Sequence, residues 1–237
     1  MFDLHLPFHY DCKIQAALQW AKKEKLKHIL LGGDIFDFIG VSSFSRNDRQ
    51  SLYAEIKKGI PKFNKYISPF NKVVYIMGNH ERRLRRYICK YAPELMEFLP
   101  NTVACVKYVL ELCGLQHNNI TFVDCLTNKN KFLPVKFGKL NIFHGDEFRI
   151  AGTLNPCRKV FNIIHDHALF GHIHIPESIL RVSVDGSTFN VVCAGTAQDE
   201  SFMSFTQWAF TVGYIESAGH GGRFRIIEKK VVGKEIY

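Results

Sequence analysis

The sequence predicts a layered α/β protein, a four-layer α/β/β/α sandwich in which two sheets pack face to face and helices cover their outer sides. Three observations favour this fold class. Up to residue 170, apolar runs that end near glycine alternate with amphipathic stretches, as in βαβ units with buried parallel strands. The chain after residue 171 contains mainly strand patterns. No repeat, low-complexity tract or linker interrupts the 237 residues, so one domain over residues 1–237 is expected.

Helix and strand patterns alternate from the start of the chain. Apolar residues recur at helical spacing over residues 11–25, and lysines near the end of this stretch suit the negative end of a helix dipole. Residues 28–31 form an apolar run before a glycine pair, which predicts a buried strand. A second helix is expected over residues 48–67 with a break near Pro61, and a second buried strand over residues 73–77.

The later elements follow the same logic. The sequence predicts a basic helix over residues 80–99 that is broken near Pro93, a helix over residues 102–115 and a strand over residues 120–123. It then predicts two strands around Gly138, a helix over residues 155–166 and a strand over residues 168–170. Strands over residues 179–184 and 188–193 flank an Asp-Gly-Ser hairpin signal, and strands over residues 208–215 and 224–232 flank a glycine-rich turn.

Composition limits the partners and the compartment. The net charge of +9 favours polyanionic partners such as nucleic acid, nucleotides or phosphorylated surfaces, although a basic balance can also serve solubility alone. The seven cysteines are irregularly spaced and form no Cys-x-x-Cys, which argues against a disulfide framework and for a reducing, cytoplasmic location. No apolar run approaches the length of a membrane span, and the first residues do not resemble a signal peptide, so no membrane partner is expected.

Five short motifs carry the chemistry of the sequence. They combine carboxylate and amide oxygens with imidazole nitrogens, which is the donor set of paired divalent transition metals in hydrolytic centres. Four of them follow an apolar run, and ligands bind at such strand ends in α/β sheets. The motifs are Asp3-Leu4-His5, Gly33-Asp34-Ile35-Phe36-Asp37, Gly78-Asn79-His80-Glu81, His144-Gly145-Asp146 and Gly171-His172-Ile173-His174.

Each motif alone has a plainer interpretation. Asp-x-His occurs by chance at surfaces, Gly-Asp after a strand is usually a turn, and Asn-His after glycine can cap a helix. His-x-His can form a small structural metal site, but structural zinc sites rely on cysteine and none of these motifs contains one. The joint occurrence of all five in this order predicts a two-metal centre that hydrolyses phosphate esters.

The spacing within the motifs favours convergence of their side chains. Asp3 and His5 are two residues apart, so at the end of an extended strand they point the same way. His172 and His174 have the same spacing and could reach neighbouring ions. Asp34 follows a strand and two glycines, and its two carboxylate oxygens can bridge two metals.

Together the motifs resemble those of the calcineurin-like metallophosphoesterase superfamily, over residues 1 to about 200. The resemblance implies two divalent metal ions, with manganese as the first choice and iron, zinc, nickel or cobalt as alternatives. It implies that one ion is held by Asp3, His5, Asp34 and His174. It implies that the other is held by Asp34, Asn79, His144 and His172, so that Asp34 is shared.

The resemblance also implies a mechanism. His80 matches the histidine of the family that contacts the phosphate and protonates the leaving oxygen, and Asp37 matches the carboxylate that orients this histidine. Pairing with Asp37 would raise the pKa of His80 and keep it protonated, as a general acid requires. A water activated by the two metals is expected to attack phosphorus in line with the leaving oxygen.

The chain departs from the patterns of some subfamilies. Only Met1 and Phe2 precede Asp3, so either the given start is late or the strand that comes before this motif in the family is shortened or supplied otherwise. Phe38 stands where serine/threonine protein phosphatases carry arginine, and His80 is present where lipid A pathway pyrophosphatases usually lack histidine. The third motif and the arginines after it are most similar to small bacterial and bacteriophage members.

Basic residues directly after the catalytic motif point to the substrate. Arg82, Arg83 and Arg86 are candidates to bind phosphates, although a solvated helix face is an equally simple interpretation. Tyr87 and Tyr91 could stack on a base, but core packing is the favoured expectation for both. We therefore expect a phosphodiesterase or nuclease acting on a nucleic acid or nucleotide. A phosphomonoesterase for a small molecule, or a non-catalytic phage or assembly protein that keeps the fold, remains an alternative.

Overall fold

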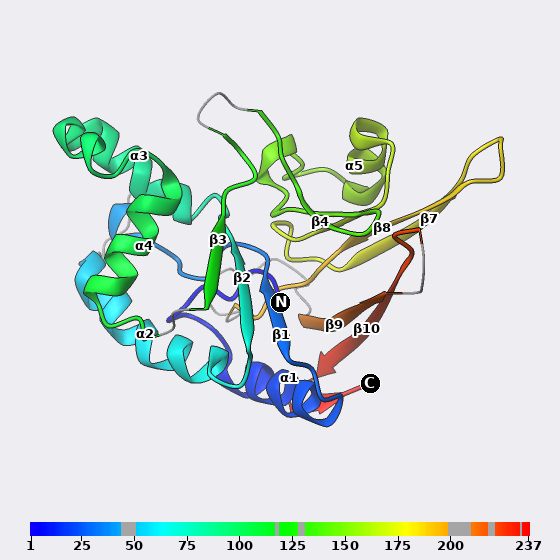
Figure 1. Cartoon of the computed structure of the whole chain (residues 1–237), viewed down its shortest axis with the longest axis horizontal. Helices are drawn as coiled ribbons and strands as arrows, with labels where there is room; N and C mark the ends of the chain where they lie inside the picture. The colour runs from blue at the N-terminus through cyan, green and yellow to red at the C-terminus, as the bar shows by residue number, and fades with distance from the viewer. Residues whose placement is uncertain (44–50, 117–118, 128–130, 199–209, 218–220, 233) are drawn as a thin grey trace.

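The structure is a computed structural model, and it describes residues 1–237 except 44–50, 117–118, 128–130, 199–209, 218–220 and 233 (Figure 1). In this described part of the chain, the strands form three sheets with the orders β1-β2-β3, β4-β5-β6-β8-β7 and β11-β10-β9. Helices flank the first two sheets on their outer sides (Figure 1). The mixed α/β class predicted from the sequence is confirmed.

The first sheet is parallel and forms from the apolar runs of the first half of the chain. It contains β1 (His28–Leu31), β2 (Lys72–Ile76) and β3 (Ile120–Val123). The helices beside it are α1 (Asp11–Lys23), α2 (Leu52–Ile67), α3 (Glu81–Tyr91) and α4 (Thr102–Leu112). Short 3₁₀ helices, η1 (Ile39–Val41) and η2 (Pro93–Glu97), join some of these elements.

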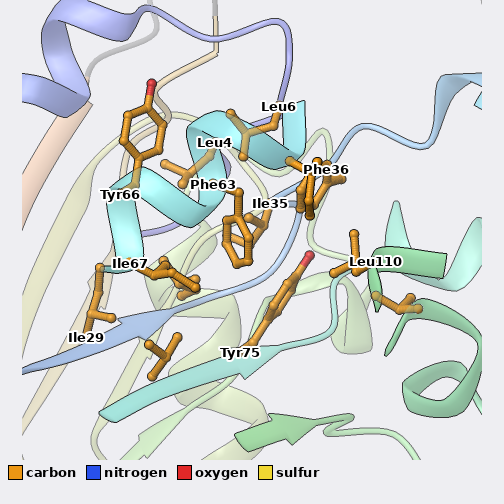
Figure 2. Close-up of a cluster of buried hydrophobic side chains, with 14 of the residues drawn as sticks. Leu4, Leu6, Ile29, Ile35, Phe36, Phe63, Tyr66, Ile67, Tyr75 and Leu110 are labelled. Carbon is orange, nitrogen blue, oxygen red and sulfur yellow. The ribbon is translucent and has the colours of Figure 1, made fainter. Parts of the chain in front are cut away.

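Side chains of the first sheet alternate between two cores, since successive residues of a strand point to opposite faces. Ile29 and Tyr75 point toward the helices and pack with Phe63 and Ile67 of α2, as Figure 2 shows. Val74 and Ile76 belong to the core that is shared with the second sheet. Both faces are therefore covered, which explains why these strands are apolar along their length rather than alternating.

The second sheet supplies the opposite layer. It contains β4 (Val135–Phe137), β5 (Leu140–Ile142), β6 (Ala168–Phe170), β7 (Glu177–Val182) and β8 (Thr188–Cys193). The central strands β5, β6 and β8 are parallel, and the outer strands β4 and β7 pair antiparallel with their neighbours. Helix α5 (Pro156–Ile164) packs against β7 and β8, and η3 (Asp146–Phe148) follows β5. The third sheet contains β9 (Phe210–Ser217), β10 (Phe224–Val232) and β11 (Glu235–Ile236).

The first six residues lie beside the segment that follows β1 without forming a regular strand. Backbone N–H groups of Asp3, His5 and Leu6 donate to the carbonyls of Gly33, Asp34 and Ile35, at 2.8–3.1 Å. On its other side this segment is bonded to the residues that follow β8 of the second sheet. The carbonyl of Asp3 accepts hydrogen bonds from the N–H of Ala197 and from the hydroxyl of Thr196. The segment therefore lies between the two sheets, and its apolar residues Phe2, Leu4 and Leu6 are buried.

Two expectations from the sequence differ from the structure. Helix α2 continues through Pro61 instead of breaking there, and Pro61 lies on the exposed side, where the carbonyl that loses its N–H partner can face water. Strand β11 was not expected, because two residues are too short to give a periodic signal. The expected starts of the second helix at residue 48 and of a late strand at residue 208 lie outside the described residues.

The state of the cysteines and the length of the helices complete the description. All seven cysteines are free thiols, and five of them are buried. Among the described residues, no helix has both the length and the apolar character needed to cross a bilayer.

Candidate metal centre

The five motifs come together where the strands of the two sheets end. Asp34 follows β1, Asn79 follows β2, His144 follows β5 and His172 follows β6. The N-terminal segment carries Asp3 into the same region, because it is hydrogen-bonded beside the residues after β1. Carboxyl ends of parallel strands are the usual ligand-binding edge of α/β sheets, and here two sheets contribute such an edge.

Left-handed backbone turns aim the side chains at one another. Left-handed conformations are uncommon outside glycine and concentrate at functional sites, where packing and hydrogen bonds hold them. Asp3 and His5 were expected to converge through an extended strand, but both have positive φ instead, because the chain turns sharply between the two sheets. Positive φ occurs at Asp3 (52°), His5 (51°), Asp34 (50°), His172 (72°) and His174 (67°).

One cluster of donor atoms contains Asp3, His5 and His174. The Oδ1 atom of Asp3 lies 3.5 Å from Nε2 of His174 and 4.0 Å from Nε2 of His5. The two Nε2 atoms lie 3.2 Å apart. All three residues can offer a ligand atom within 4.8 Å of the others, which is close enough to share one ion.

A second cluster contains Asp34, His144 and His172. The Oδ2 atom of Asp34 lies 3.2 Å from Nε2 of His144, and the same nitrogen lies 3.2 Å from Oδ1 of Asn79. Asp34 also forms a group with His5 and His80, so it lies between the two clusters. The structure thus brings together all seven residues that the sequence predicted as metal ligands.

The donor atoms fit bound cations better than they fit one another. Oδ1 of Asp3 is buried and accepts no hydrogen bond from the described residues, although a buried carboxylate oxygen is costly to leave unpaired. The other oxygen of Asp3 is held by the backbone N–H of His172 at 2.9 Å. Facing imidazole nitrogens and carboxylates, without a thiolate, form a set that divalent transition metals accept. Two divalent ions could be held here, with Asp34 near both.

His80 lies beside the clusters and is fixed by Asp37. Its Nδ1–H donates to the carbonyl oxygen of Asp37 at 2.9 Å, and Nε2 lies 3.6 Å from Oδ2 of Asp34. Burial lowers the pKa of His80, but the carboxylates of Asp34 and Asp37 outweigh it, so the pKa is raised above its ordinary value.

The carboxylate of Asp37 is shared between two histidines. Its Oδ2 lies 3.1 Å from Nδ1 of His5, and its Oδ1 lies 3.6 Å from Nδ1 of His80. Burial opposes ionisation of Asp37, but hydrogen bonds with His5 and His80 hold its pKa well below the usual range. The carboxylate of Asp37 therefore contacts a residue of the first cluster, while its backbone carbonyl accepts the hydrogen bond of His80.

Glu81 is a supporting residue to which the sequence analysis gave no role. Its buried carboxylate accepts from the N–H groups of Asp34 and Gly78 at 2.9 Å each, from Ile35 at 2.8 Å and from the Tyr75 hydroxyl at 2.7 Å. Burial raises the pKa of Glu81, but donors point at both of its oxygens, which matches the carboxylate form. The only sequence signal is a glutamate in the first turn of a helix between apolar strands, which also fits an ordinary helix start.

The three candidate arginines occupy different places. Arg82 points inward and pairs with Asp124 at 2.7 Å, with Asp146 at 2.5 Å and with Glu147. Arg83 reaches the candidate centre, where its Nη2 lies 2.8 Å from Nε2 of His80. Arg86 is exposed and donates from Nη2 to the carbonyl of Asn79 at 3.0 Å. Arg82 therefore joins α3 to the second sheet, while Arg83 and Arg86 remain near the surface of the centre.

Comparison with known proteins agrees with this geometry. The family model described as calcineurin-like phosphoesterase matches residues 3–176, which is most of the chain and contains all five motifs. No curated protein matches the chain significantly.

Proposed function

The chain belongs to the calcineurin-like phosphoesterase family, whose members are generally metal-dependent hydrolases of phosphate esters, and we propose that it hydrolyses phosphodiesters of a nucleic acid or nucleotide. The observation that carries the proposal is the meeting of two Asp/His clusters around Asp34, with His80 and Arg83 at their side. A purely structural metal site would not need a histidine and an arginine beside its ligands.

The proposed ligands divide between two ions as the family resemblance implies. Two divalent ions would neutralise the charge of the phosphate and make water acidic enough to attack at neutral pH. We assign no metal by its donors alone, and manganese is the first ion to test because mixed carboxylate and imidazole sites accept it. One site would contain Asp3, His5, Asp34 and His174, and the other Asp34, Asn79, His144 and His172.

His80 is proposed to supply the proton for the leaving oxygen. Its Nδ1–H is engaged with the carbonyl of Asp37, so Nε2 is the nitrogen that is available to substrate. In the structure Nε2 accepts a hydrogen bond from Nη2 of Arg83 at 2.8 Å, so this nitrogen carries no proton while the contact persists. Arg83 must therefore leave this contact when substrate binds, and its planar fork of N–H donors would then bind phosphate oxygens. Asp37 holds both partners, since Arg83 also donates to its carbonyl at 3.0 Å.

The diester and nucleic-acid assignment rests on charge. The chain carries a net charge of +9, and Arg83 and Arg86 flank the residues that would perform the chemistry. A backbone diester remains anionic on both sides of the cleaved bond, so cations beside the centre would bind neighbouring phosphates as well as the reacting one.

The test is a substrate panel with the manganese-loaded protein. It contains a bis-aryl phosphate, an aryl monophosphate, and single- and double-stranded DNA and RNA, and the matched variants are His80→Ala and the exposed His28→Ala. We expect cleavage of the diester and of at least one nucleic acid, lost by about 10²–10⁴-fold in His80→Ala and kept in His28→Ala. Preference for the monoester with no nucleic-acid cleavage would identify a phosphomonoesterase, and absence of all turnover would favour a non-catalytic protein.

A further inference from the structure

One face of α3 presents cations and aromatic rings to solvent, beginning at the candidate centre. The sequence analysis expected Tyr87 and Tyr91 to pack in the core, but their exposed fractions are 44% and 61%. The core positions of the helix are Leu84 and Ile88, which are buried. Arg83, Tyr87 and Tyr91 are spaced four residues apart, so they follow one another along the same side of the helix.

This face is continuous with the residues that would perform the chemistry. Helix α3 starts at Glu81, directly after His80, and lies at the periphery of the molecule (Figure 1). With a rise of about 1.5 Å per residue, the distance along the helix axis from Arg83 to Tyr91 is about 12 Å. A ligand that lies on this face can therefore reach from the candidate centre across more than one nucleotide.

The exposed groups hold one another in place at the surface. The rings of Tyr87 and Tyr91 are 4.8 Å apart between centroids with an interplanar angle of 47°, so they touch without stacking on each other. The Nζ atom of Lys90 lies 4.9 Å from the centroid of Tyr91, a cation–π distance. Arg86 is tied through Nη2 to the backbone of Asn79. Rings and charges are thus presented together rather than covered by the protein.

We propose that this face of α3 is a track for single-stranded nucleic acid that enters the candidate centre. Arg83, Arg86 and Lys90 would bind backbone phosphates, and bases would stack on Tyr87 and Tyr91. The inference rests on the proposed function and specifies its substrate class.

Two features favour a single strand over other occupants. Aromatic rings can stack on bases only when the base faces are free, and in a duplex neighbouring pairs cover those faces. The charge of the face is complementary to phosphates as far as Tyr91, beyond which η2 presents the exposed acids Glu94 and Glu97. The track therefore ends near Tyr91, which limits it to a short run of nucleotides.

Binding of fluorescein-labelled oligonucleotides, measured by anisotropy in a chelator that prevents cleavage, tests the track. We expect the parent protein to prefer single strands over a duplex of the same sequence. Tyr87→Ala and Tyr91→Ala should each weaken single-strand binding by about 5- to 150-fold, while Tyr87→Phe and Tyr91→Phe retain it because the ring face remains. The matched control is Tyr108→Ala, which removes an equally exposed tyrosine from α4 and should have no effect.

The salt dependence provides a second measurement that does not depend on the tyrosines. Lys90→Gln should lower the slope of log affinity against log salt by about 0.7, the loss of one phosphate contact to a single strand. An unchanged slope, together with unchanged binding in the alanine variants, would overturn the track. So would a polyglutamate peptide that binds as tightly and with the same sensitivity to Tyr87→Ala, since that result would assign the face to an acidic protein partner.

Failure of the track and failure of the proposed function give different results. If the parent cleaves the bis-aryl phosphate but binds no oligonucleotide through Tyr87 and Tyr91, the track is wrong and the hydrolase proposal stands. If the parent binds single strands through these tyrosines but cleaves no phosphate ester, the hydrolytic proposal is wrong and the track stands.

Discussion

Replacing Glu81 by glutamine should destabilise the protein and weaken metal binding, although the two side chains have nearly the same shape. The carboxylate has an acceptor oxygen on each side, one facing Asp34 and Gly78 and the other facing Ile35 and Tyr75. Glutamine keeps only one acceptor, and its NH₂ group would face donors on the other side.

The size of the effect follows from the contacts. Each hydrogen bond that the carboxylate accepts contributes about 1.5–3 kcal/mol, and the glutamine variant would lose two of them. If the Tyr75 hydroxyl rotates and accepts from the new amide, the loss is close to a single hydrogen bond. The expected cost is therefore about 2–6 kcal/mol, which corresponds to a fall in Tm of about 4–24 °C for a protein of this length. Metal affinity should fall as well, because the backbone of Asp34 and the turn before Asn79 lose the group that holds them.

The assay is urea unfolding at pH 7 followed by circular dichroism, with manganese binding by calorimetry on the same samples. Glu94→Gln is the matched control, since Glu94 is exposed on η2 and its replacement should change stability by less than about 0.5 kcal/mol. Tyr75→Phe removes a single donor and should cost less than Glu81→Gln. A Glu81→Gln protein that unfolds at the same urea concentration as Glu94→Gln, and binds manganese equally well, would refute this role.

Three further outcomes are expected. Burial raises the pKa of Glu55 from 4.5 to about 7, so the native state holds a proton that the unfolded chain releases at lower pH. Stability should therefore fall by up to about 3 kcal/mol as pH rises from about 4.5 to above 7, and urea titrations of Glu55→Gln should lack that fall. Arg82→Met leaves three acidic side chains without their cation, so it should cost about 3–5 kcal/mol at pH 7.5 in the same assay; a cost below about 1 kcal/mol would contradict the ion pairs as a tie between α3 and the acids. Manganese at 100 times its Kd should stabilise the parent by about 2.7 kcal/mol, which thermal shift measurements would detect as a rise in Tm. His174→Ala should abolish this rise, and the surface variant His28→Ala should retain it.

The sequence predicts those parts of the fold that depend on local pattern. Strands β1 and β2 were expected at nearly their observed bounds, because an apolar run that ends near glycine is both a buried strand and a turn signal. Helix α4 was expected over residues 102–115 and starts where expected, but it ends earlier, at Leu112. The motifs likewise indicated the order in which site residues follow the strands.

Features that depend on contacts between distant segments could not be predicted. Arg82 turns inward because acids from two other segments pair with it, and the run of arginines gave no sign that one of them would point inward. The exposure of Tyr87 and Tyr91 depends on which side of α3 meets α4, which helical spacing alone does not decide. The left-handed backbone at Asp3 arises from hydrogen bonds to residues near 33 and 197, so no local propensity encodes it.

The position of the N-terminal segment has a consequence for how this region assembles. The carbonyl of Asp3 accepts hydrogen bonds from Thr196 and Ala197, and its carboxylate accepts one from the backbone of His172, so residues far apart in the sequence fix this segment. The region therefore cannot assemble before residues 172–197 are present, and a chain truncated ahead of His172 would lack a donor residue of each cluster.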